Sequence, residues 1–268
     1  MKAVVLAGGQ GTRLRRPSPG ARLDAAQTAA ADRGLKALVP IGGRPLLDYG
    51  FSRLADAGVT DVVVVIGPAS AAIREHYTRT PPTRVRLAFA EQREPRGSAD
   101  ALLAAEPLVE RGEFLALNSD DLYPSSAFRG LAALGAPGLP VFSGETLLSR
   151  SNFRRERLAS FATLEIDRDQ RLRRIVEKPA PGAPAGTEEG AWYSMNLWRL
   201  SPSIFAACRR VPLSARGERE LPQAVGFGIV ELGLEFRTFP CGEGVLDLST
   251  RDDVAGLGAR LAGETPRP

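Results

Sequence analysis

Three glycines and an arginine follow the first apolar run of the chain, a combination suited to binding phosphate. They are Gly8, Gly9, Gly11 and Arg13. Glycine reaches backbone conformations closed to other residues, and free N–H groups in such a loop cradle anions. The loop is not a dinucleotide fingerprint, because Leu14 stands where the third glycine belongs, and it lacks the Gly-Lys-Ser/Thr of a Walker loop. A plain strand-to-helix turn would account for one or two of the glycines, but not for the arginine as well. The residues therefore predict a phosphate loop of a third kind.

Lysine is rare in this chain, although basic residues are common. Only three of the 35 basic residues are lysine, namely Lys2, Lys36 and Lys178. Lysine is a compact charge on a flexible stem and can reach a phosphate oxygen, whereas arginine presents a planar fork. Lys2 is explained by the edge of the first strand. A lysine kept against an arginine background indicates a specific role for Lys36 and Lys178.

Two aspartates in strand-like runs are candidate metal ligands. Asp120 ends one apolar run and Asp247 lies in another. Mg²⁺ takes one or two carboxylates and completes its octahedron with phosphate oxygens and water. A second reading is open on the residues alone, because aspartate also caps helices. Asp120 or Asp121 would then cap the segment after Pro124, and Asp247 a helix beginning near Thr250.

Strand and helix patterns alternate in the first half of the chain. Strands are predicted at residues 2–7, 61–67, 84–92, 113–121, 161–167, 173–179, 193–200 and 234–240. Helices are predicted at residues 44–58, 69–77 and 98–110. This alternation is typical of an α/β fold with a Rossmann-like, mostly parallel mixed sheet and helices on both faces. The second half has more strand patterns and fewer helical ones, so it is expected to extend the sheet or to build a lid beside it.

Length and composition indicate a compact globular protein. The chain has 268 residues, 43% of them apolar, which is enough for a substantial core. We expect one domain over residues 1–262, a surface loop at 178–190 and a frayed tail at 263–268. Cys208 and Cys241 have neither metal-ligand nor disulfide spacing and are expected to pack as small apolar residues.

Charge and hydropathy exclude several classes of function. The net charge of +4 comes from basic residues scattered among 31 acids, so no nucleic-acid partner is expected. No stretch approaches the roughly 18 apolar residues of a membrane span, and the short apolar start does not fit a signal peptide. A cytoplasmic location is the expectation. The lone histidine, His76, lies in a predicted surface helix and is not a candidate for catalysis.

Six segments occur in this order along the chain: LAGGQGTRL with the following LKALVPIGGRPLLDY, EQREPRGSADAL, LNSDDLY, VEKP, SARGERELP and VLDLST. They resemble the signature segments of the sugar-1-phosphate nucleotidyltransferases, also called nucleoside-diphosphate-sugar pyrophosphorylases. The resemblance is closest to the glucose-1-phosphate thymidylyltransferases and implies the nucleotide-diphospho-sugar transferase fold. It also implies a nucleotide-binding half at about residues 1–125 and a sugar-phosphate-binding half at about 126–262.

The resemblance assigns the nucleoside triphosphate to the glycine loop and the second segment. A glutamine amide and a backbone carbonyl, from Gln92 and Gly97, can pair with the donor-acceptor edge of uracil or thymine, so dTTP or UTP is the favoured substrate. The residues expected to bind the nucleotide are Leu6, Ala7, Gly8, Gly9, Gly11, Thr12, Gln92, Gly97 and Ser98.

The resemblance also implies which charges serve the reaction, in which a sugar 1-phosphate attacks the α-phosphate and pyrophosphate leaves. Lys36 and Arg13 would bind the leaving end of the triphosphate. Lys178, assisted by Arg216, would hold the attacking phosphate. The remaining implied site residues are Asp120 and Asp247 for Mg²⁺ and Glu177 and Asn196 for the sugar, although the Asn196 amide could equally tie a loop.

Three departures from the family pattern weaken any transfer of substrate identity. The segment at residues 15–35 is about a dozen residues longer than in the thymidylyltransferases that the chain resembles, and it is expected to be an ordered lid or a mobile flap. Leu35 precedes Lys36 where proline is usual, and Ser119 precedes Asp120 where glycine is usual.

Other functions stay open beside the favoured one. Cytidylyl or guanylyl transfer to a cyclitol phosphate, a phosphonate or another phosphorylated acceptor would use the same residues. A non-catalytic nucleotide-sugar-sensing regulatory subunit is a rival of another class, although the metal aspartates and phosphate lysines favour an enzyme. Homo-oligomerisation is left open by the sequence.

Overall fold

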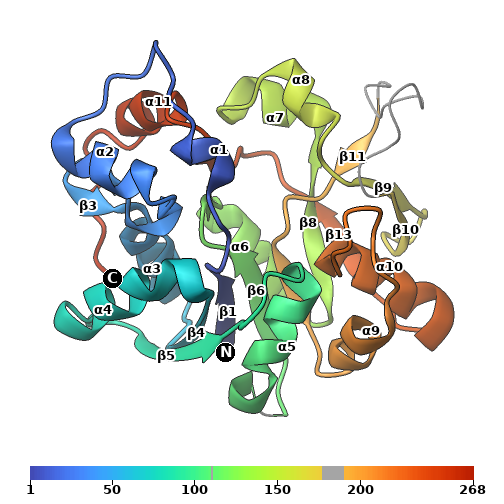
Figure 1. The fold of residues 1–268 in the computed structure, drawn as a ribbon. Coiled ribbons are helices and arrows are strands. Elements are labelled where there is room, and N and C mark those ends of the chain that lie inside the picture. Colours follow the sequence, from blue (N-terminus) through green and yellow to red (C-terminus); the bar gives the residue numbers. More distant parts are fainter. Residues whose placement is uncertain (110, 177–189) are drawn as a thin grey trace.

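A central mixed sheet runs through both halves of the chain (Figure 1). The computed structural model describes residues 1–109, 111–176 and 190–268. Within them, the sheet contains nine strands side by side and a tenth, β13 (Arg237–Pro240), paired with β8. In spatial order the nine are β10 (Leu172–Val176), β9 (Thr163–Ile166), β11 (Trp192–Tyr193), β8 (Gly138–Ser143), β12 (Trp198–Leu200), β6 (Phe114–Asn118), β1 (Lys2–Leu6), β4 (Asp61–Ile66) and β5 (Arg86–Glu91).

The first half supplies the parallel part of the sheet. Strand β1 pairs in parallel with β4 and β6, and β4 pairs in parallel with β5. Strands β12, β11, β9 and β10 are antiparallel to their neighbours and extend the same sheet. The predicted α/β fold is therefore confirmed, and the second half extends the sheet.

The helices cover both faces of the sheet. They are α1 (Thr12–Arg15), α2 (Ala25–Asp32), α3 (Leu46–Asp56), α4 (Ala71–Arg79), α5 (Ser98–Val109), α6 (Ser125–Ala133), α7 (Gly144–Arg150), α8 (Arg155–Leu158), α9 (Ile204–Arg210), α10 (Leu221–Leu232) and α11 (Asp253–Arg260). Short elements complete the fold: the 3-10 helices η1 (Lys36–Leu38) and η2 (Pro68–Ser70), and the paired strands β2 (Pro40–Ile41) with β3 (Arg44–Pro45) and β7 (Asp121–Leu122) with β14 (Leu246–Asp247).

Alternation along β1 explains the two main cores. Successive side chains of a strand point to opposite faces. Ala3 and Val5 face a core with α3, α4, α6 and α7, whereas Val4 faces a second core with α5, α9 and α10. Because both faces are covered, β1 is apolar throughout its centre.

The insertion at 15–35 is ordered and packs against the C-terminal helix. It contains α2, which lies beside α11 in Figure 1 and shares a third core with it. Asp24 and Gln27 form a capping box at the start of α2. Arg251, just before α11, donates to Leu14 O at 3.0 Å and pairs with Asp32 at 2.5 Å. Of the two expected forms, the segment takes the ordered one.

Two expectations for the second half were wrong. The tail does not fray, because Pro268 O accepts hydrogen bonds from Thr83 N and Arg84 N. The expectation of few helices in the second half was also wrong, because α7, α8, α9 and α10 lie outside the predicted helices. In α10, Gly226 and Gly228 lower the helix propensity. Packing decides there: a Cβ on Gly228 would lie 2.8 Å from Leu234, so glycine allows a close contact.

No helix among the described residues is long and apolar enough to cross a membrane. Cys208 and Cys241 are buried free thiols, as predicted.

Candidate active site

Two adjoining cavities open at the carboxyl end of β1, where the glycine loop lies. The larger has a volume of about 460 Å³ and the smaller about 90 Å³, and both are lined by Leu6, Gly9 and Asp120. In open α/β sheets ligands bind at the carboxyl ends of the strands. Every residue expected to bind the nucleotide lines one cavity or both: Leu6, Ala7, Gly8, Gly9, Gly11, Thr12, Gln92, Gly97 and Ser98.

A contact between two glycines positions Lys36 beside the loop. Gly11 and Gly34 both have left-handed backbones, with φ of 60° and 71°. A Cβ on Gly11 would lie 2.2 Å from Gly34 O, and a Cβ on Gly34 would lie 2.5 Å from Gln10 O. Leu35 is buried, and its N–H donates to Ala30 O. The approach of Lys36 is therefore fixed although Leu35 is not proline.

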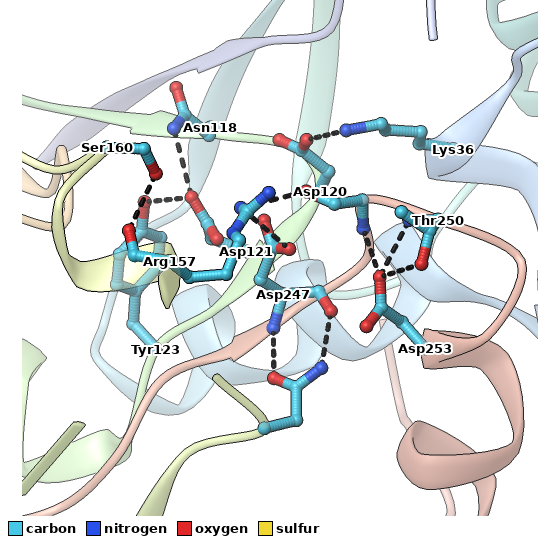
Figure 2. Close-up of polar contacts among 12 residues, drawn as sticks. Lys36, Asn118, Asp120, Asp121, Tyr123, Arg157, Ser160, Asp247, Thr250 and Asp253 are labelled. Carbon is cyan, nitrogen blue, oxygen red and sulfur yellow. Dashed lines mark hydrogen bonds and ion pairs between the residues drawn. The ribbon is translucent and has the colours of Figure 1, made fainter. Parts of the chain in front are cut away.

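Lys36 reaches across to the end of β6. Its Nζ lies 2.7 Å from Asp120 Oδ2, and both side chains are largely buried (Figure 2). Burial alone would lower the pKa of Lys36, but the charges of Asp120 and Asp247 raise it above its ordinary value. Lys36 is therefore charged at neutral pH. Arg13 is exposed on α1, close enough for its charge to oppose protonation of Lys36.

Two further aspartates, Asp121 and Asp247, lie close to Asp120. Asp121 and Asp247 are register partners in the β7–β14 ribbon, and Asp120 directly precedes β7 (Figure 2). None of them caps a helix: α6 begins after Pro124 without a side-chain cap, and Asp253 accepts the hydrogen bonds at the start of α11. The capping alternatives for Asp120, Asp121 and Asp247 are thus excluded.

The negative charges of the clustered aspartates repel one another. Burial, and then the charge of Asp120, raises the pKa of Asp247. Burial also raises the pKa of Asp121 well above its usual range, with smaller contributions from Asp120 and Asp247. Asp121 accepts a hydrogen bond from Asn118 at 2.9 Å, and its Oδ1 is buried without a partner in the described part of the chain. A divalent cation between Asp120 and Asp247 would offset this charge.

Two residues that the sequence did not single out hold Asp247 in place. The Asn152 side chain donates to Asp247 O and accepts from Asp247 N, both at 2.8 Å. Arg157 donates to Ser249 Oγ at 3.1 Å and lies 3.5 Å from Asp247 Oδ2 (Figure 2). Asn152 therefore fixes the backbone of the candidate metal ligand, and Arg157 contacts its carboxylate.

The segment at 214–222 is bonded to the start of α5. Arg219 N donates to Arg96 O at 2.8 Å, and Ala99 N donates to Arg219 O at 2.9 Å. A Cβ on Gly97, where φ is 103°, would lie 2.3 Å from Arg219 O. Glycine at 97 is therefore required by this close approach. Arg216, in the same segment, pairs with the buried Glu220.

The expected base-pairing groups are bonded to each other. Gln92 Nε2 donates to Gly97 O at 2.9 Å and to Asp100 Oδ2 at 3.0 Å. Gly97 O also accepts from Ala101 N at 3.0 Å. Both lone pairs of that carbonyl are therefore used, so it does not offer the acceptor that the sequence interpretation assigned to it.

Only part of the predicted sugar-phosphate site lies in the described residues. Glu177 and Lys178 lie outside them. Asn196 has a left-handed backbone with φ of 57°, and its Oδ1 is buried without a hydrogen-bond partner in the described segments. An unpaired buried amide oxygen is costly unless a ligand or water completes it.

Similar proteins of known activity share this chain's sequence pattern. A UTP–glucose-1-phosphate uridylyltransferase of Haloferax volcanii is 28% identical over 238 residues, covering 84% of this chain and 82% of that protein. A glucose-1-phosphate thymidylyltransferase of Streptomyces antibioticus is 28% identical over 225 residues, 84% of this chain but only 56% of that longer protein.

Solved structures share the fold at low identity. A UDP-glucose pyrophosphorylase in complex with UDP-glucose has a TM-score of 0.75 at 16% identity, covering 98% of this chain and 99% of that one. An inositol-1-phosphate CTP transferase from T. maritima has a TM-score of 0.70 at 17% identity, with 98% and 97% covered. The family model for nucleotidyl transferases matches residues 2–225. The chain therefore belongs to the nucleotidyl transferase family, whose members among its relatives are sugar-1-phosphate nucleotidyltransferase enzymes.

Proposed function

We propose that this protein transfers a nucleotidyl group from dTTP or UTP to a sugar 1-phosphate and releases pyrophosphate. One observation carries the proposal: the 2.7 Å contact of Lys36 Nζ with Asp120 Oδ2 at the mouth of the glycine-loop cavities. In the proposal Lys36 binds phosphate and Asp120 binds the metal ion, and the glycine loop lines the same cavity as both residues. Residues 1–262 act as a single unit in this proposal, and the cytoplasm is its expected compartment.

The reaction needs no nucleophile from the protein. A phosphate oxygen of the sugar 1-phosphate attacks the α-phosphorus, and the bond from that phosphorus to the bridging oxygen of pyrophosphate breaks. The chain must therefore align the reactants and stabilise charge on the leaving group. In the proposal, the glycine-loop amides, Lys36 and Arg13 stabilise that charge at the leaving end.

Asp120 and Asp247 are the residues that would hold Mg²⁺. No group of three or more His, Cys, Asp or Glu side chains suited to a metal occurs among residues 1–109, 111–176 and 190–268. Two neighbouring carboxylates suit Mg²⁺, which takes its other ligands from phosphates and water. When bound, the ion would neutralise the triphosphate and polarise the α-phosphate. Lys36 would exchange Asp120 for a phosphate oxygen as the nucleotide binds.

The sugar 1-phosphate would lie between the aspartates and the second half of the sheet. Asn196 Oδ1 is suited to accept a hydrogen bond from a sugar hydroxyl, because it is buried and unpartnered in the described structure. In the proposal Lys178 and Arg216 hold the attacking phosphate, and Glu177 binds sugar hydroxyls. Arg216 would loosen its pairing with Glu220 to do this.

A matrix of substrates tests the proposal. dTTP, UTP, CTP, GTP and ATP are each combined with several sugar 1-phosphates and with a cyclitol phosphate, and pyrophosphate release is measured with Mg²⁺. Turnover of dTTP or UTP with a sugar 1-phosphate is expected. Turnover confined to CTP or GTP with a cyclitol phosphate or phosphonate would replace this function by its close chemical rival. Nucleotide-sugar binding without any turnover would indicate a regulatory subunit.

A further inference from the structure

The Gln92 amide is held in one orientation by two acceptors. Its Nε2 donates to Gly97 O and to Asp100 Oδ2, at 2.9 and 3.0 Å. A peptide carbonyl and a carboxylate accept hydrogen bonds and do not donate them. The group that faces them must be the NH₂ of the amide, because the opposite orientation would set three oxygens against one another. The chemistry of its partners thus fixes the direction of the amide.

The amide oxygen consequently points to the other side, toward the glycine loop. Gln92 is buried, and a Cβ on Gly8 would lie 3.3 Å from Oε1. No residue in the described structure donates a hydrogen bond to Gln92 Oε1. Gln92, Gly8 and Gly97 all line the cavity of about 460 Å³. Gln92 therefore presents a hydrogen-bond acceptor, not a donor, to a base bound there.

We infer that Asp100 is a positioning residue for base selection. It holds Gln92 so that Oε1 accepts from a ring N–H, which selects uracil or thymine against cytosine. This inference rests on the proposed function and explains its preference for dTTP or UTP. The sequence interpretation had assigned no role to Asp100, which lies in the first turn of α5.

The discrimination follows from the protonation of the pyrimidine ring. N3 of uracil and thymine carries a hydrogen that can be donated to Oε1, whereas N3 of cytosine carries a lone pair. Cytosine in the same pose would set two hydrogen-bond acceptors against each other. A site built to accept a hydrogen bond from a substrate rejects an analogue that cannot donate it. With Asp100 replaced, only Gly97 O still opposes rotation of the amide, so the preference should weaken.

The test compares wild type with Asp100→Ala and Asp100→Leu, neither of which can accept a hydrogen bond from Gln92. Glu106→Gln is the matched control, because it removes one negative charge from the same helix at a position paired with Arg209. For each protein, the dissociation constants of UTP, dTTP and CTP are measured calorimetrically with Mg²⁺, and kcat/KM is measured with one sugar 1-phosphate. Thermal unfolding checks that each variant is folded.

Wild type and Glu106→Gln are expected to prefer UTP or dTTP over CTP by the same factor. In the Asp100 variants the preference factor is expected to fall about tenfold, which corresponds to the loss of one hydrogen bond to a charged group. The fall should come mainly from tighter binding of CTP. An unchanged ratio in folded Asp100 variants, or a wild-type protein that prefers CTP, would overturn the inference and leave nucleotidyl transfer standing. A wild-type protein that binds none of the three nucleotides would instead overturn the proposed function, and the inference with it.

Discussion

Replacing Gly34 with alanine tests whether the contact between the two glycines positions Lys36. Gly34 has φ of 71°, and an added Cβ would lie 2.5 Å from Gln10 O and 2.7 Å from Arg15 Nε. A left-handed backbone costs a non-glycine residue about 1–2 kcal/mol, and forcing a methyl group into a packed contact costs about 1–3 kcal/mol. The free energy of unfolding should therefore fall by about 2–5 kcal/mol. The variant should still fold, since domains are stable by about 5–15 kcal/mol.

Gly43→Ala separates the two costs. Gly43 has φ of 79°, but nothing lies within 4 Å of an added Cβ. Its expected cost is the backbone part alone, about 1–2 kcal/mol. Urea unfolding at 25 °C gives both values. The difference between the variants then measures the contact of Gly34 with the glycine loop.

Activity provides the second readout, because Lys36 N donates to Gly34 O at 3.0 Å and must move with it. A displacement of about 1 Å in a positioning group costs up to about 10²-fold in rate, so kcat/KM of Gly34→Ala should fall at least about tenfold. Gly43→Ala should keep its rate within about twofold, as an exposed position away from the cavities. Equal stability and equal activity of the two variants would refute the role given to this contact.

Two further predictions concern Asp247 and the cysteines. Asn152→Ala leaves the backbone of Asp247 without its two hydrogen bonds to the Asn152 side chain, so the apparent Mg²⁺ affinity in the activity assay should fall about tenfold. The control Ser149→Ala, on the exposed face of α7, should not change this affinity. A fall in kcat at saturating Mg²⁺ with unchanged Mg²⁺ affinity would contradict the role of Asn152. Burial raises the pKa of Cys208 to about 12, and Cys241 is also buried. A thiol reagent at pH 8 should therefore label neither cysteine in the native protein and both cysteines in 6 M guanidinium. Rapid labelling of Cys208 in the native protein would contradict its burial.

Residue type and order sufficed to single out Lys36 and Asp120, which the structure brings together. Lys36 stood out because lysine is rare in the chain, and Asp120 because a charged residue ended an apolar run. Both signals are local, and the fold brought them to 2.7 Å. The strands of the parallel half were equally predictable, since short apolar runs bounded by glycine and polar residues identify buried strands.

The supporting residues could not be predicted in the same way. Asn152 and Asp247 are 95 positions apart and meet only because the chain after α7 runs beside β14. Gly34 is one of 28 glycines, and nothing in its neighbours reveals that Gly11 lies against it. Asp100 looks like an ordinary acidic residue in the first turn of a helix. Each depends on a tertiary contact rather than on a pattern.

Product formation by wild type and by Asp120→Asn tests the central claim most directly. Wild-type protein with Mg²⁺, a sugar 1-phosphate and dTTP or UTP should release pyrophosphate and form a nucleoside-diphosphate sugar in equal amounts, identified by mass spectrometry. Asp120→Asn should lower kcat by about 10²-fold or more, since it removes a preorganised charge at the reacting phosphates, while its melting temperature stays close to that of wild type. Equal rates in the two proteins, or no nucleoside-diphosphate sugar from wild type with any acceptor, would contradict the account.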